Sequence, residues 1–520
     1  MKKCKIEATL DEEKKYGKRF YRGFLIWICI LAFGLVRMEL QNDTFYTIKI
    51  GELILNNGID MLDHFSFHAG LAYTYPHWLY DVFIYFIYSL FGLNGIYISS
   101  IILLMVLLGA VFKTNNLVCE SKMVSAFATF ICALAISGFV TARAQLVSFI
   151  LFIIEIYFIE AFLKKKHWKY LAGLFLISLA LCNIHVAVWP FYFILYLPYL
   201  AEYLLSFIFS KFKNKKNGKI INFLDRKFEF EKNENVKYLL LIMGISVLTG
   251  LMTPIGDTPY TYLIKTMMGN SQKYIQEHQM ISWINSPFTI IIAVETIFLT
   301  CLAKVKLRDL FMICGLVIMS IFSIRHISLL ALIGTVCFAR VFATFLSNYG
   351  FTADKMLLKF FNKKIVVISS FILVIVGTLL LFNTQMKDDF INEDLYPVEA
   401  TKYIKENIDV SKMKLFNDYN FGSYLLFNDI PVFIDSRADL YTKQFSGLEY
   451  DIFDDYEYII SNYQEKFEFY GITHALIYKN NNNFYQVLDR DLNYKIIYED
   501  DNFGLFEKIG SSDVIISYIN

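Results

Sequence analysis

Long apolar runs constrain the fold of this chain more than any other feature of its sequence. A helix needs about 20 mostly apolar residues to cross a membrane, with a range of about 17 to 25. Eleven runs of roughly this length occur among the 520 residues, at 22–38, 96–112, 123–140, 144–163, 168–184, 186–208, 237–253, 285–303, 309–324, 327–345 and 364–383. We therefore predict an all-α polytopic membrane domain with about eleven transmembrane helices.

Charge divides the chain into two parts. From Thr384 to the end the sequence has 25 Asp and Glu against 12 Lys and Arg, whereas the preceding part carries a net charge of +14. This split predicts a transmembrane domain at 1–383 and a separate acidic domain at 384–520, and it argues against nucleic acid as a partner.

The positions of the basic residues predict the orientation in the membrane. With a cytoplasmic N-terminus, the inner segments hold 30 Lys and Arg and the outer loops before the acidic tail hold 6, while Arg340 lies inside a run. This bias is typical of the positive-inside rule. If the short, Tyr-rich stretch 78–91 were a span, the Lys164–Lys166 cluster would lie outside, against the positive-inside rule. We therefore predict that residues 78–91 form a helix lying at the membrane interface. The tail is then extracytoplasmic.

The acidic tail has the pattern of a small α/β domain. Short β-rich runs alternate with amphipathic helical stretches. The runs are at 414–417, 431–435, 473–479, 494–498 and 503–508, and the helical stretches are at 398–408, 456–470 and 483–489. The sequence contains no CxxC pair, P-loop or GxGxxG motif, which disfavours a zinc or disulfide framework and nucleotide-driven transport.

Ionisable residues gather at the predicted outer ends of the runs and in the outer loops. Charges at membrane depth are costly and mark functional sites. Carboxylates there are suited to act as a base or as metal ligands, and Arg and His are suited to hold an anionic lipid phosphate. The candidates are Asp43, Asp60, Asp63, His64, Arg143, His185, Glu277, His278, Arg325 and His326.

Each candidate also has a purely structural interpretation. A single Asp in an outer loop is usually solvated, and the Glu277–His278 pair fits the same description. Arg143 and Arg325 are placed where long cationic side chains reach for the interface. His185 is placed where a helix-packing hydrogen bond is common. The sequence leaves these alternatives open.

The order of motifs in the first outer loop resembles a known superfamily. The loop contains Asn42–Asp43–Thr44–Phe45–Tyr46, Gly51, Asp63–His64–Phe65–Ser66 and Tyr75–Pro76–His77–Trp78–Leu79. This series resembles the first external loop of membrane glycosyltransferases of the GT-C superfamily, such as protein O-mannosyltransferases and aminoarabinose transferases. In those proteins an acidic residue follows the first helix, and a Pro-containing segment leads into a helix along the membrane surface.

Further segments are similar to a group of bacterial GT-C-like multi-spanning proteins. They are Thr141–Gln145, Asn183–His185, Thr253–Gly256, Glu277–His278, Arg325–His326, and the Asp-x-Arg signature formed by Asp435 and Arg437. The chain departs from the group at Ala144 in place of Pro, His278 in place of Trp, and His326 in place of Arg.

The resemblance implies a hexosyl- or pentosyltransferase that uses a polyprenyl-phosphate-sugar donor and a glycan, lipid or protein acceptor. It implies Asp43 as the base, with Asp60 and Asp63 in reserve, and a phosphate site at Arg143, His185, Arg325 and His326. No cofactor is required, and a divalent cation is optional. We expect Asp435 and Arg437 to pair or to cap a turn rather than to react.

Two other classes of protein compete with the transferase. A transporter of a lipid-linked substrate predicts inverted repeats and charges at the bilayer midplane. A non-catalytic cell-envelope assembly protein would bind a polysaccharide precursor through the tail, and would not need Asp43.

Overall fold

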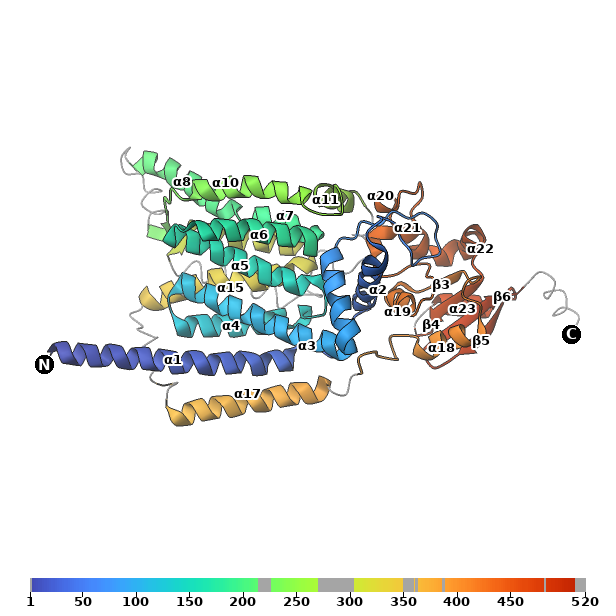
Figure 1. Ribbon diagram of the computed structural model, residues 1–520, viewed down its shortest axis with the longest axis horizontal. Helices are drawn as coiled ribbons and strands as arrows, with labels where there is room; N and C mark the ends of the chain where they lie inside the picture. Colours follow the sequence, from blue (N-terminus) through green and yellow to red (C-terminus); the bar gives the residue numbers. More distant parts are fainter. Residues whose placement is uncertain are drawn as a thin grey trace, which may run out of the picture. The chain divides into compact units, whose positions relative to one another are not determined.

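The computed structural model describes residues 2–213, 226–269, 304–348, 360, 363–385, 389–480 and 483–509. These residues form a largely helical protein (Figure 1). They group into two compact units, one of residues 1–37, 97–253 and 276–387, and the other of residues 38–96, 254–275 and 388–520. The first loop of the chain therefore belongs to the same unit as the acidic tail.

The first unit is a helical bundle. Its helices are α1 (Lys2–Leu35), the second part of α3 (Trp78–Cys119), α4 (Lys122–Ile136), α5 (Ala144–Lys165), α6 (Trp168–Ile184), α7 (Trp189–Ile194), α8 (Leu197–Lys213), α10 (Val236–Ser246), α14 (Leu307–Phe322), α15 (Ile327–Asn348) and α17 (Lys364–Gln385). Helix α5 packs against α6, α4 against α15, α1 against α17, and α14 against both α8 and α15.

Several helices of the described residues have the length and composition of membrane spans. Five are long and apolar enough to cross a membrane, at Trp78–Cys119, Lys122–Phe139, Ala144–Lys165, Val186–Ser210 and Ile324–Asn348. Three shorter apolar helices lie at Trp168–Ile184, Val236–Leu251 and Lys364–Leu380. The chain is a helical membrane protein, as predicted. The count of eleven spans and the orientation of the termini stay predictions, and the run at 285–303 lies outside the described residues.

Helix α3 is broken close to the end of the predicted interfacial segment. Gly92 has φ 59° and ψ −154°, which no helix accommodates, and divides α3 into two helical segments. Glycine adopts this conformation without the steric cost that a side chain would add. Residues 78–91 thus form a helical segment separate from the long helix that follows, and their position at the interface stays a prediction.

The second unit contains a four-stranded sheet in the order β3-β4-β6-β5. Strands β3 (Leu415–Asn417) and β4 (His474–Tyr478) are parallel, whereas β6 (Phe503–Lys508) is antiparallel to both β4 and β5 (Tyr494–Glu499). The accompanying helices are α2 (Asn42–Asn57), α11 (Thr258–Met268), α18 (Val398–Asn407), α19 (Gly422–Phe427), α20 (Lys443–Ser446), α21 (Ile452–Glu457), α22 (Ile459–Tyr470) and α23 (Asn483–Asp489).

The strand predicted at 431–435 is wrong, because this segment forms only isolated bridges, from Val432 to Ser66 and Leu415. The side chain of Asn417 takes the place of a neighbouring strand. Its Oδ1 accepts a hydrogen bond from the backbone N–H of Phe433 at 2.9 Å, and its Nδ2 donates to the carbonyl of Ile434 at 2.8 Å. The backbone polar groups are satisfied without a ladder.

The first loop packs onto the tail within the second unit. The ring of Phe45 on α2 is fully buried and lies 5.1 to 5.4 Å from the rings of Tyr396, Tyr424 and Phe427. On another face of α2, a Cβ added at Gly51 would lie 2.1 Å from the carbonyl oxygen of Asp81. Only glycine permits so close an approach of α2 to the start of α3. The predicted domain boundary after residue 383 stays a prediction.

Candidate functional site

Four of the predicted site residues lie on linked turns in the first unit. Arg143 is the residue before α5, His185 directly follows α6, and Arg325 and His326 lie between α14 and α15. The hydroxyl of Ser148 on α5 lies 2.9 Å from Nδ1 of His185, which ties the end of α6 to the start of α5.

The turn before α15 is tied to the same end of α5. Nε2 of Gln145 donates to the hydroxyl of Ser328 at 3.5 Å, and that hydroxyl donates to the carbonyl of Arg325 at 2.8 Å. Nδ1 of His326 lies 3.0 Å from the carbonyl of Met319. The structure therefore brings Arg143, His185, Arg325 and His326 to one end of the bundle.

An apolar cavity of about 260 Å³ lies next to this end, between α5, α7, α8, α14 and α15. Phe152, Leu195, Phe311 and Leu329 are among its lining residues. Two others, Phe191 and Met319, also contact His326, since the rings of Phe191 and His326 are 5.3 Å apart. An apolar ligand with an anionic head matches this combination of an apolar wall and adjacent cationic side chains.

The predicted carboxylates lie in the second unit and have different surroundings. Asp43 is partly exposed in the first turn of α2. Asp60 is exposed, and its Oδ2 lies 2.6 Å from Nε2 of His64, while Tyr75 donates a hydrogen bond to its Oδ1 at 3.2 Å. Burial alone would raise the pKa of Asp60, but the hydrogen bonds from the backbone of Leu62 and from His64 lower it.

The side chain of Asp63 has no exposed surface, and both of its oxygens are occupied. Nη1 of Arg437 donates to Oδ1 at 2.7 Å, and the hydroxyl and backbone N–H of Ser66 donate to Oδ2 at 2.6 and 2.9 Å. Burial favours a higher pKa, but the charge of Arg437 and the bonds from Ser66 outweigh it and lower the pKa of Asp63.

Asp435 and Arg437 form a bidentate ion pair. Nε and Nη2 of Arg437 donate to the two oxygens of Asp435 at 2.9 and 2.7 Å, and Tyr441 donates to Oδ2 at 2.5 Å. The guanidinium also lies 5.0 Å from the ring centre of Tyr73 and 5.5 Å from that of Phe65. Both charged side chains are buried, and through Asp63 the guanidinium of Arg437 also joins the first loop to the tail. This agrees with the expectation that the two residues pair.

The remaining candidates are Glu277 and His278, which lie outside the described residues. Within the part of the chain that the structure describes, no group of three or more His, Cys, Asp or Glu is arranged to hold a metal ion. The independence from a cofactor stays a prediction.

The structure adds buried charged residues that the sequence reasoning did not select. In the first unit, Glu160 of α5 lies between two arginines, 2.6 Å from Arg340 of α15 and 3.4 Å from Arg308 of α14. Arg308 also pairs with Glu202 at 3.1 Å, and Arg340 with Asp309 at 2.5 Å.

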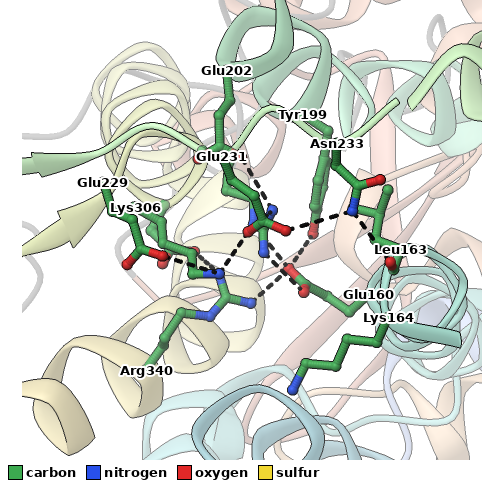
Figure 2. Close-up of polar contacts among 12 residues, drawn as sticks. Glu160, Leu163, Lys164, Tyr199, Glu202, Glu229, Glu231, Asn233, Lys306 and Arg340 are labelled. Carbon is green, nitrogen blue, oxygen red and sulfur yellow. Dashed lines mark hydrogen bonds and ion pairs between the residues drawn. The ribbon is translucent and has the colours of Figure 1, made fainter. Parts of the chain in front are cut away.

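The segment before α10 adds Glu231 to this network. Glu231 forms an ion pair with Arg308 at 3.2 Å and accepts a hydrogen bond from Lys306 at 2.7 Å, while the hydroxyl of Tyr199 donates to Glu160 at 3.1 Å (Figure 2). Such a network joins α5, α8, α14 and α15. Charged residues within the apolar runs could have been recognised as notable in the sequence, because buried intramembrane charges need partners. The sequence could not show which of these charged residues pair with one another.

Asp81 in the first turn of α3 is a further buried carboxylate. It is fully buried, and neither oxygen has a hydrogen-bond partner among the described residues. The charge of Arg437 is close enough to act on it. In the sequence, Asp81 is part of the stretch 78–91, which predicted a helix but gave no reason to select this carboxylate.

We expect His68 to make the stability of the second unit depend on pH. Its Nε2 lies 2.8 Å from the carbonyl of Phe433, and burial lowers its pKa from 6.5 to about 4 although this hydrogen bond acts in the opposite direction. Between these values the folded state binds fewer protons than the unfolded state. The free energy of unfolding should therefore fall by up to about 3 kcal/mol as the pH drops from 6.5 to 4.

The variant His68→Gln isolates this effect, because its amide can donate to the same carbonyl and does not titrate. Thermal unfolding of both proteins between pH 7 and pH 4 should show a steeper loss of melting temperature for the wild type. Parallel curves for the two proteins would contradict the assignment.

Comparisons with known proteins define the class of fold. No family model and no curated protein sequence matches the chain. Solved structures do match it, and they show that the chain has the fold of GT-C membrane glycosyltransferases, as the resemblance implied.

Two of these structures show the extent of the likeness. One is the Archaeoglobus fulgidus oligosaccharyltransferase tethered to an acceptor peptide containing the NVT sequon, with 12% identity, a TM-score of 0.56, and coverage of 89% of this chain and 70% of that chain. The other is ArnT from Cupriavidus metallidurans bound to undecaprenyl phosphate, with 12% identity, a TM-score of 0.51, and coverage of 94% and 98%.

Proposed function

We propose that the chain is a membrane glycosyltransferase that transfers a sugar from a polyprenyl-phosphate-linked donor to an acceptor at the outer face of the membrane. The observation that carries this proposal is the apolar cavity beside the Arg143, His185, Arg325 and His326 end of the bundle, within a GT-C fold. An isoprenoid chain is apolar and its phosphate is anionic, so one molecule satisfies both features. ArnT, which shares the fold, binds undecaprenyl phosphate.

The chemistry of transfer needs two kinds of group. As the acceptor attacks the anomeric carbon, the bond to the lipid phosphate breaks and negative charge grows on that phosphate. Arg and His donors stabilise this charge. The attacking hydroxyl or amine loses its proton to a carboxylate.

Among the three candidate carboxylates, we take Asp43 as the base, because it is partly exposed in the first turn of α2, where an acceptor from solvent can reach it. Arg437 and Ser66 occupy both oxygens of Asp63, and Asp60 is engaged by His64 and Tyr75. We therefore assign Asp63 a structural role and keep Asp60 as the reserve base.

Arg143→Ala and Arg325→Ala should each weaken binding of undecaprenyl phosphate by about 10- to 150-fold. A charge-assisted hydrogen bond contributes about 1.5–3 kcal/mol, and each variant removes one such donor. Binding to the purified chain in detergent can be measured by native mass spectrometry or by quenching of tryptophan fluorescence.

Lys165→Ala is the matched control. Lys165 is exposed in the last turn of α5, at the opposite end from Arg143, about 33 Å along a helix of 22 residues. It should bind the lipid as the wild type does. Equal affinity of all four proteins would remove the basis of the proposed donor site.

A further inference from the structure

A second cavity, of about 500 Å³, lies within the second unit. Lys49, Glu52, Asn56 and Asn57 of α2 form one wall. The other walls are formed by the loop after α2, with His64 and Phe65, and by the segment after α19, with Leu426, Asp429, Ile430 and Pro431. Its volume lies in the range of sites that bind small molecules.

The charged side chains of this cavity are joined by ion pairs. Nζ of Lys49 lies 2.7 Å from Oε2 of Glu52 and 2.7 Å from Oδ1 of Asp429, and so joins α2 to the segment after α19. The side chain of Lys49 is 16% exposed, whereas that of Asp429 is 74% exposed. His64 is held by Asp60 at 2.6 Å. A site whose side chains are already fixed loses less freedom when a ligand binds.

The chemistry of the walls favours a neutral or amine-bearing carbohydrate. The amide groups of Asn56 and Asn57 can each donate and accept hydrogen bonds, which matches the hydroxyl groups of a sugar. Glu52 and Asp429 add two carboxylates against the single cation of Lys49, which disfavours an anionic ligand. Phe65 adds an aromatic surface on which the apolar face of a sugar ring can lie.

The cavity lies along the same helix as Asp43. Asp43 is in the first turn of α2, and the lining residues follow from Lys49 to Asn57. With a rise of 1.5 Å per residue, they lie about 9–21 Å along the helix axis from Asp43. A ligand that fills the cavity and also reaches Asp43 must therefore be longer than a single sugar unit.

We propose that this cavity binds sugar units of an extended acceptor, and that the acceptor is a neutral or amine-bearing oligosaccharide or polysaccharide. This inference rests on the proposed transferase function only in calling the ligand an acceptor. The binding of such glycans is a property of the cavity itself.

The purified full-length chain, in detergent, is tested on an array of neutral, amine-bearing and anionic oligosaccharides. We expect retention of neutral or amine-bearing glycans. The double variant N56A/N57A should bind them about 5- to 150-fold more weakly, since it removes two amide side chains that each contribute about one hydrogen bond. Asp429→Asn, which keeps the shape of the wall, should weaken the amine-bearing glycans more than the neutral ones.

Gln464→Ala is the matched control, because Gln464 is an exposed amide on α22 and does not line the cavity. It should bind as the wild type does. Retention of no glycan, preference for anionic glycans, or unchanged binding by N56A/N57A would overturn the inference.

The two proposals can fail separately. The glycan-binding assay contains no lipid-linked donor, so it reports on the cavity without requiring transfer. If the glycans bind at the cavity but no transfer from a lipid-linked donor occurs, the glycan site stands and the transferase is wrong. If transfer occurs but no glycan binds, the transferase stands and the cavity is not an acceptor site.

Discussion

Asp43→Asn should lower the rate of sugar transfer by about 100- to 10,000-fold, which is the usual effect of removing a general base. The substitution keeps the size of the side chain and its ability to form hydrogen bonds, but it removes the group that accepts the proton. Asp43 is partly exposed in the first turn of α2, so an acceptor from solvent can reach it. The measurement is single-turnover transfer from a polyprenyl-phosphate-sugar donor, with undecaprenyl phosphate binding and melting temperature recorded in parallel.

The other two carboxylates are informative comparisons. Asp60→Asn should retain most of the activity, because Asp43, and not the reserve carboxylate Asp60, is proposed to take the proton. Asp63→Asn should lose activity together with melting temperature, because it weakens a buried ion pair with Arg437. Near-normal turnover by Asp43→Asn would exclude it as the base. A non-catalytic assembly protein would instead show no transfer in any variant, the wild type included.

The helical membrane fold could be predicted because its cause is local. A run of about 20 apolar residues has no stable alternative to a buried or membrane-spanning helix. The strands of the tail were predicted nearly to the residue at β3, β4, β5 and β6 for the same reason, since alternation and β-rich composition are written in consecutive positions. The segment at 431–435 has the same composition, but the distant Asn417 takes its hydrogen bonds.

The candidate site was predictable only in part. The lengths of the spans bring alternate turns to the same side of the bundle. They therefore predict that one end of the bundle holds Arg143, His185, Arg325 and His326. The pairing of Asp63 with Arg437 joins residues 374 positions apart, and that of Glu160 with Arg340 joins residues 180 apart. No periodicity specifies such contacts, so the sequence could place Asp63 among the catalytic carboxylates while the structure shows it in an ion pair.

Arg437→Ala should destabilise the second unit by about 3–5 kcal/mol, the usual cost of removing one partner from a buried charge network. The side chain of Arg437 is 3% exposed, and it donates hydrogen bonds to Asp63 and Asp435, whose side chains have no exposed surface. Without the guanidinium both carboxylates lose their cation, and the rings of Tyr73 and Phe65 lose the group they pack against. Arg437 also joins the first loop to the tail, so its loss should release that loop from the tail surface.

The measurement is the melting temperature of the purified chain together with limited proteolysis of the loop at residues 58–77. Arg490→Ala, an exposed arginine of the same unit, should leave both unchanged. Arg437→Lys should recover part of the stability, because one ammonium can pair with one carboxylate but cannot reproduce the bidentate contact with Asp435 while also reaching Asp63. If Arg437→Ala melted within a degree of the wild type and its loop stayed protected from protease, the Asp-x-Arg signature would not be what fastens the first loop, and Asp63 would return as a candidate for the base.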